Sequence, residues 1–159
     1  MRISFHLNGE SVEIDTMPHR RAIDLLREFF QIRSLYHLCA NRGCGSCLIL
    51  LDDSLMHSCC IPAFELRLKD IWTVEGISSR REFKDLADGF DRAGARLCNF
   101  CAPSRALVAE TLLKSTLHPN AEQLRSSAEA VRCGCISTSR IIDGFTAAAE
   151  FRRKRLRAQ

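Results

Sequence analysis

The stretch CANRGCGSC at residues 39–47, together with Cys59, decides how the first half of this chain folds. Its cysteines form the pattern C-x4-C-x2-C-x11-C and are called here the N-terminal cysteine group: Cys39, Cys44, Cys47 and Cys59. Glycines and small residues between them let the backbone wrap closely around a bound group. Four thiolates are the ligand set of one metal site, so the stretch predicts a metal-binding loop.

The spacing of this group favours iron and sulfide over other metals. C-x4-C-x2-C with a distant fourth cysteine is typical of plant-type [2Fe-2S] ferredoxins. Zinc is the main rival because four-thiolate zinc sites are common, although the x4 gap and the x11 arm are unusual for a zinc ribbon. The loop therefore predicts an iron–sulfur cluster, with zinc as the alternative.

Strand and turn patterns lie on both sides of the loop. Alternating apolar residues flank Asn8-Gly9, a strong two-residue hairpin turn. Apolar residues at helical spacing predict a helix over roughly residues 20–30, and a second hairpin over 47–58 turns at Asp52-Asp53. Hairpin, helix, cysteine loop and further strands predict a small α+β fold of the β-grasp type.

The second half is helical and holds a second set of cysteines. Four helical patterns occur here. The first follows a capping box at residues 79–82, the second begins at Pro103, the third follows a cap at 119–123, and the fourth begins near Ile141. Four antiparallel helices are the simplest arrangement, with two connections that meet at one end of the bundle. These connections carry the C-terminal cysteine group: Cys98, Cys101, Cys133 and Cys135.

Taken alone, the C-terminal cysteine group is ambiguous. Its pattern is C-x2-C, a 31-residue gap and C-x-C, which suits a structural zinc site as well as an iron–sulfur cluster. We expect a ferredoxin-like domain over residues 1–76 and a helical domain over residues 77–159, each with one metal site.

The order of the two groups resembles the small iron–sulfur subunit of the xanthine dehydrogenase/aldehyde oxidase (molybdenum hydroxylase) family. The resemblance covers nearly the whole chain. Both cysteine groups carry it, with the segments Asn8-Gly9, Pro62-Ala63, Val74-Glu75-Gly76, Cys98-Asn99-Phe100-Cys101-Ala102-Pro103, Cys133-Gly134-Cys135 and Ile141.

This resemblance implies an N-terminal ferredoxin-like β-grasp domain and a C-terminal four-helix domain, each binding one [2Fe-2S] cluster through its cysteine group. Electrons would pass from molybdopterin on a large catalytic subunit to the helical cluster, then to the ferredoxin-like cluster, and then to FAD on another subunit. The chain would be the electron-transfer subunit of an oxidoreductase, without catalytic residues of its own. A heterotrimer, with dimerisation of the whole as an option, is the implied assembly.

Residues that face the pterin in the family are altered here. Leu97 stands where the family usually has a glutamine that touches the pterin, and Asn99, Ser104 and Gly134 also differ. A buried pterin group beside Leu97 would need water or another residue as its polar partner. An iron–sulfur carrier for a non-molybdenum partner is therefore an alternative function, and a zinc-stabilised interaction module is a third.

Composition, charge and missing motifs argue against several other classes of protein. The chain of 159 residues is 46% hydrophobic and 26% charged, which is typical of a soluble globular protein, and its net charge of +4 does not favour nucleic acid. Without an apolar run of about 18 residues or a secretion signal, we expect a cytoplasmic protein without a membrane span. No G-x-G-x-x-G or P-loop motif is present, so the chain itself should not bind FAD.

Other residues have simpler explanations. The basic residues over 152–157 are best explained as the solvated end of a helix, with an acidic partner surface as the alternative. Cys60, the ninth cysteine, is expected to be a small buried hydrophobe, with exchange for Cys59 as a ligand as the alternative. His37 and His57 flank ligands and are expected on polar faces, with modulation of a cluster's potential as the alternative. Trp72 is expected to pack in the sheet.

Overall fold

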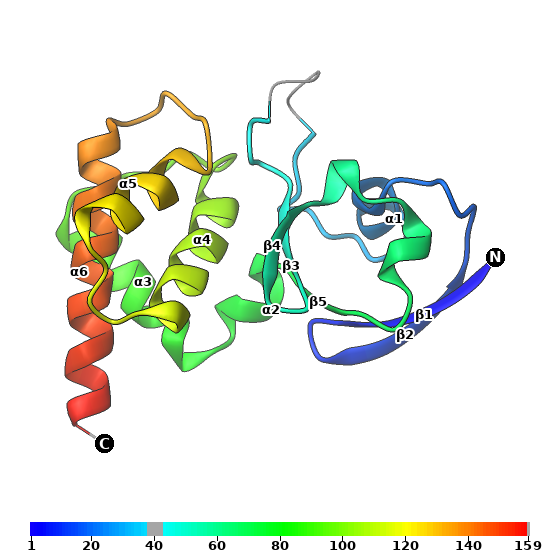
Figure 1. The fold of residues 1–159 in the computed structure, drawn as a ribbon, viewed down its shortest axis with the longest axis horizontal. Helices are drawn as coiled ribbons and strands as arrows, with labels where there is room; N and C mark the ends of the chain where they lie inside the picture. Colours follow the sequence, from blue (N-terminus) through cyan, green and yellow to red (C-terminus); the bar gives the residue numbers. More distant parts are fainter. Residues whose placement is uncertain (38–42, 159) are drawn as a thin grey trace.

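The computed structural model describes residues 1–37 and 43–158. Figure 1 shows a sheet-containing half with the N-terminus and a helical half with the C-terminus, joined at the short helix α2 (Val74–Ser78). This is the expected α+β fold, a ferredoxin-like β-grasp domain followed by a helical domain. The expected boundary between residues 76 and 77 falls within α2 and stays a prediction.

Within the described residues, the β-grasp domain has one five-stranded sheet in the order β2-β1-β5-β3-β4. Strands β1 and β5 pair in parallel, and the other neighbours pair antiparallel. Both expected hairpin turns are confirmed: Asn8 has φ 53°, and Asp52 and Asp53 have φ 47° and 64°. The elements are β1 (Arg2–Leu7), β2 (Glu10–Asp15), α1 (Ala22–Phe29), β3 (Leu48–Leu51), β4 (Ser54–His57), η1 (Ser58–Cys60), η2 (Ala63–Leu66) and β5 (Asp70–Trp72).

The helical domain contains the four expected helices. They are α3 (Arg81–Arg92), α4 (Ala102–Ser115), α5 (Ala121–Glu129) and α6 (Thr138–Arg157). Pro103 lies in the first turn of α4, and Asn120 forms a capping box with Gln123 at the start of α5. Gly94, with φ 62°, ends α3 as expected because a glycine adopts this conformation without strain.

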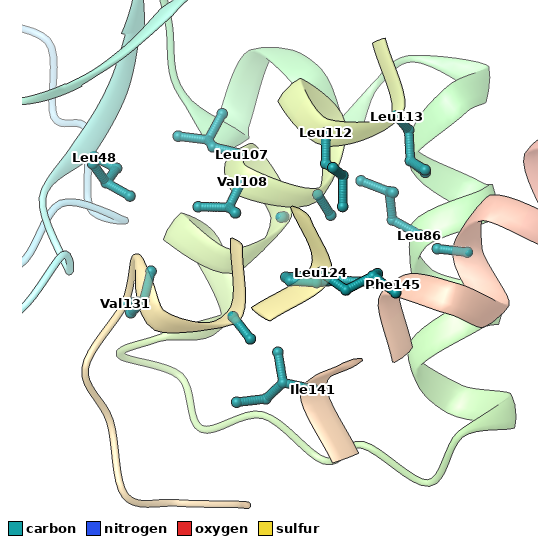
Figure 2. Packing of buried hydrophobic residues seen from close by; sticks show 14 of the residues in the cluster. Leu48, Leu86, Leu107, Val108, Leu112, Leu113, Leu124, Val131, Ile141 and Phe145 are labelled. Atoms are coloured by element: carbon teal, nitrogen blue, oxygen red, sulfur yellow. The ribbon is translucent and has the colours of Figure 1, made fainter. Parts of the chain in front are cut away.

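Strand β3 contributes to the cores of both domains because successive side chains of a strand point to opposite faces. Ile49 packs in the β-grasp core, whereas Leu48 and Leu50 pack in the helical core. Figure 2 shows Leu48 on the sheet side of this core, near Leu107 of α4. The three β3 side chains are at most 4% exposed. The two domains are therefore joined by a shared buried strand.

The capping box expected at residues 79–82 is absent. The N-cap of α3 is Arg80, which makes no side-chain capping hydrogen bond. Ser79 instead ends α2, and its hydroxyl donates to the carbonyl of Gly76 at 3.0 Å. The prediction was wrong because the preceding short helix already uses the serine.

The interpretation of the basic C-terminal residues as solvated was wrong for Arg152. Its side chain is 4% exposed, and it donates to Asp85 of α3 at 2.6 Å and to Glu110 of α4 at 2.8 Å. Arg155 forms a second ion pair with Asp85 at 3.0 Å. These contacts hold α6 against two other helices, whereas Lys154 is exposed as expected.

The length and apolar character of the helices bear on whether one could span a membrane. Within the part of the chain that the structure describes, none is both long and apolar enough to cross a bilayer.

Candidate metal centres

The thiols of the C-terminal cysteine group converge at one end of the helical domain. The Sγ atom of Cys98 lies 3.5 Å from that of Cys101 and 3.6 Å from that of Cys133, and the Sγ atoms of Cys101 and Cys135 lie 3.5 Å apart. All four sulfur atoms lie within 4.8 Å of one another. The two helix connections expected to meet therefore do meet.

Local structure at the start of α4 explains how the first two thiols are placed. Cys101 is the N-cap of α4, and the backbone N–H groups of Cys101 and Ala102 both donate to the carbonyl of Cys98, at 3.2 and 3.0 Å. This turn brings residues 98 and 101 to one side of the chain, and Pro103 fits in the first helical turn because no N–H is needed there. The helix start therefore presents both thiols to the loop between α5 and α6.

Crowding and burial act against ionisation at two of these thiols. Burial and hydrogen bonding to two neighbouring thiols raise the pKa of Cys101 to about 12, although the Arg105 guanidinium opposes that rise. A backbone N–H favours the Cys133 thiolate, but burial and the neighbouring thiols raise the pKa of Cys133. Burial also opposes ionisation of Cys98, yet hydrogen bonds, chiefly from the backbone of Cys101, lower the pKa of Cys98 to about 7. Four close thiolates need a cation between them, so this donor set fits a metal centre.

Three members of the N-terminal cysteine group lie in described residues, and Cys39 lies outside them. The Sγ atoms of Cys47 and Cys59 are 3.4 Å apart, and the Ser58 hydroxyl donates to the carbonyl of Cys47 at 2.7 Å. Burial and contact with neighbouring thiols raise the pKa of Cys59 well above its usual range. Cys59 therefore reaches the loop from η1, as the x11 arm predicts.

The expectation that Cys60 is buried was wrong. Cys60 is exposed, whereas Ser58, at the other end of η1, is fully buried. The 3-10 turn points residues 58 and 60 in different directions, so only one can face the core. Cys60 Sγ lies 3.7 Å from Cys59 Sγ, and His57 Nδ1 lies 3.9 Å from Cys47 Sγ.

A direct backbone contact connects the two cysteine loops. The N–H of Arg132 donates to the carbonyl of Cys44 at 2.8 Å, so a residue adjacent to Cys133 touches a member of the other group. Gly45 packs beside this contact with φ +79°, and a Cβ there would lie 2.5 Å from the Ala130 carbonyl oxygen. Only glycine fits both the backbone conformation and the space.

The residues that depart from the family pattern lie within three positions of a cysteine of the C-terminal cysteine group. Leu97 is half-buried against the helical core, and Ser104 is fully buried. Asn99 and Gly134 are exposed. Phe100 is also exposed on one side and packs edge-to-face on Tyr36, with ring centroids 4.9 Å apart.

Sequence reasoning missed one residue at this site, Arg105. Its guanidinium donates to the carbonyls of Ala128 and Val131 and is 1% exposed. The available signal was a charged residue four positions after Cys101, in a helix that is otherwise apolar on that side.

A β-grasp sheet followed by a helical domain with four converging thiols defines a metal-binding protein, and the comparisons identify it as an iron–sulfur protein. A family model described as a [2Fe-2S] binding domain matches residues 73–146, a range that contains the whole C-terminal cysteine group. The nicotinate dehydrogenase small FeS subunit of Eubacterium barkeri is 32% identical over 133 residues, which cover 84% of this chain and 85% of that protein. Another nicotinate dehydrogenase subunit, from Pseudomonas putida KT2440, is 30% identical over 152 residues, which cover 96% of this chain and 97% of that protein.

A solved structure extends this similarity to three dimensions. A chain of quinoline 2-oxidoreductase from Pseudomonas putida 86 superposes with a TM-score of 0.85 at 33% identity, over 96% of each chain. The present chain belongs to the family of small iron–sulfur subunits of the molybdenum hydroxylases, the xanthine dehydrogenase and aldehyde oxidase family. It is thus a non-catalytic electron-transfer subunit of an oxidoreductase.

Proposed function

We propose that the chain binds two [2Fe-2S] clusters and relays electrons from a molybdopterin catalytic subunit to a FAD subunit. Cys98, Cys101, Cys133 and Cys135 would hold the helical cluster, and Cys39, Cys44, Cys47 and Cys59 the ferredoxin-like cluster. Each cluster, when bound, accepts and releases one electron. The convergence of four thiols within 4.8 Å is the observation that carries the proposal.

The contact between the loops supports a relay over two separate carriers. Because the Arg132 N–H donates to the Cys44 carbonyl at 2.8 Å, the ligand loops are in van der Waals contact through their backbones. The role of this chain is to hold the two sites close to each other, while substrate chemistry belongs to the partner.

Metal analysis of the anaerobically purified chain tests the cluster count. We expect about four irons and about four acid-labile sulfides per chain, with two distinct EPR signals after reduction by dithionite. About two irons and one signal would contradict the two-cluster proposal. A colourless protein containing zinc would contradict the electron-transfer role itself.

Replacing Gly45 by alanine should weaken the contact between the two cysteine loops. The added Cβ would meet the Ala130 oxygen at 2.5 Å and the Val131 Cα at 2.9 Å, both backbone atoms that cannot rotate away. We expect a stability loss of about 1–3 kcal/mol from overpacking. Separation of the loops should also slow transfer between the clusters, measured as the rate at which the second cluster is reduced after the first in rapid-freeze EPR.

Gly43→Ala is the matched control for this prediction. Gly43 also has a positive φ, +57°, but a Cβ there meets no heavy atom within 4 Å. Gly43→Ala therefore introduces backbone strain without a clash. The rate of electron transfer between the clusters should remain that of the unmodified chain. Equal slowing in both variants would show that the contact at Gly45 has no part in the relay.

The comparisons also support a substrate class for the complex. The relatives are named for nicotinate and quinoline, both nitrogen heterocycles, so a heterocycle is the substrate that we propose for the catalytic partner. The half-buried Leu97 is the observation that favours the second candidate, a partner without molybdopterin. Molybdenum, FAD and subunit ratios in the complex purified through a tag on this chain distinguish the two. A cytoplasmic location stays a prediction.

A further inference from the structure

Arg105 is a buried cation one helical turn beyond Cys101. Its backbone N–H donates to the carbonyl of Cys101 at 2.9 Å, so the two residues share a face of α4. Its side chain is 1% exposed and lines the same pocket as Cys133 of that group. The guanidinium is therefore a fixed positive charge at the wall of the C-terminal cysteine group.

Two of its donors hold the segment that leads to the other two cysteines. One terminal nitrogen donates to the carbonyl of Ala128 at 3.0 Å, and the other donates to that of Val131 at 2.8 Å. Ala128 lies in the last turn of α5 and Val131 follows its C-cap, and carbonyls at a helix C-terminus lack partners and favour a cation. Arg105 thus fixes the chain two residues before Cys133.

The Nε–H donor of Arg105 and the positive charge of its guanidinium lack partners among the described residues. Within the described residues, the buried Nε atom of Arg105 has no hydrogen-bond acceptor, and no carboxylate pairs with the guanidinium. Burying an unpaired donor and an unpaired charge destabilises a fold unless a bound anion offsets it. A [2Fe-2S] centre held by four thiolates would be such an anion, and Arg105 lines the same pocket as Cys133, one of the thiols that would hold it.

We propose that Arg105 is a positioning and charge-setting residue that raises the reduction potential of the helical cluster. This inference rests on the proposed function. Reduction adds one electron to the cluster, supplied by the donor subunit or by dithionite, and no bond is made or broken. The cluster becomes more negative by one charge, so a nearby fixed cation stabilises the reduced form over the oxidised one. The buried position prevents water and salt from screening this effect.

An EPR-monitored redox titration of the full chain with both clusters tests the proposal. In Arg105→Met, we expect the ratio of reduced to oxidised helical cluster at a fixed ambient potential to fall by about tenfold, equivalent to a potential lower by about 59 mV for one electron. Arg105→Lys keeps the charge and should retain most of the original potential. The ferredoxin-like cluster should titrate unchanged in each variant and serves as an internal reference.

Arg132→Met is the matched control. Arg132 adjoins Cys133 in sequence, but its side chain is exposed, so water screens its charge. We expect a much smaller shift than in Arg105→Met. If the methionine variant does not retain the helical cluster, Arg105→Gln takes its place, because it is neutral but can still donate to the α5 carbonyls.

Three results would overturn the inference: an unchanged potential in the neutral variants, equal shifts in the lysine and neutral variants, or an equal shift in Arg132→Met. Failure of the proposed function would look different, because the unmodified chain would then lack the helical EPR signal altogether.

Discussion

Replacing Cys98 by serine is expected to remove the helical cluster and to leave the ferredoxin-like cluster in place. The Sγ atom of Cys98 contacts those of Cys101 and Cys133, at 3.5 and 3.6 Å, so it is central to its group. A serine oxygen is a poor ligand for an iron–sulfur cluster, which selects soft thiolates. Iron should fall from about four to about two per chain, with loss of one of two EPR signals.

Cys60→Ser is the control for this experiment. Cys60 is exposed and belongs to neither cysteine group, although its sulfur lies 3.7 Å from that of Cys59. Iron content and both EPR signals should therefore be unchanged. If Cys98→Ser removed both signals while its far-UV circular dichroism remained native, the two sites could not be independent. If Cys60→Ser lost the ferredoxin-like signal, Cys60 would have to be assigned as a ligand.

Replacing Arg152 by methionine is expected to destabilise the helical domain by about 3–5 kcal/mol. Glu110 is 3% exposed and, among described residues, has Arg152 as its hydrogen-bonding cation at 2.8 Å. Asp85 would keep Arg155, but Glu110 would be left as a buried charge without a partner. The midpoint of urea unfolding, followed by far-UV circular dichroism at equal iron content, measures the loss.

Two further variants separate the buried ion pair from the general effect of removing a charge. Lys154 is exposed on the same helix, so Lys154→Met should change stability by no more than about 0.5 kcal/mol. Arg152→Met combined with Glu110→Leu removes both charges and should recover part of the loss, because an apolar pair needs no partner. A double variant as unstable as Arg152→Met alone would contradict this account.

Features governed by local chemistry could be predicted from the sequence. The Asn8-Gly9 turn has the positive φ angles that its residues favour. The capping box between Asn120 and Gln123 forms at the position that its sequence pattern predicts. The cysteine spacings were informative for the same reason, because a ligand loop is a local structure. The meeting of two helix connections then followed from the simplest bundle topology.

Features that depend on distant partners could not be predicted. Arg152 bonds Asp85, which lies 67 positions earlier in the chain. A run of basic residues at the end of a chain shows the same sequence pattern whether it is buried or solvated. Arg105 likewise reaches carbonyls 23 and 26 positions ahead. Cys60 and Ser79 were misjudged over shorter ranges, because a 3-10 turn and a five-residue helix leave almost no periodic signal.

The alternation of side chains along β3 limits how this protein could be divided. Leu48 and Leu50 come from the ferredoxin-like sheet but complete the core of the helices, where they are 4% and 1% exposed. A fragment ending after the sheet would leave both leucines in water, and a fragment starting at α3 would have a gap where they belong. Gene fission into two separate polypeptides, or transplantation of either half as an independent module, would thus require a redesigned surface on each piece.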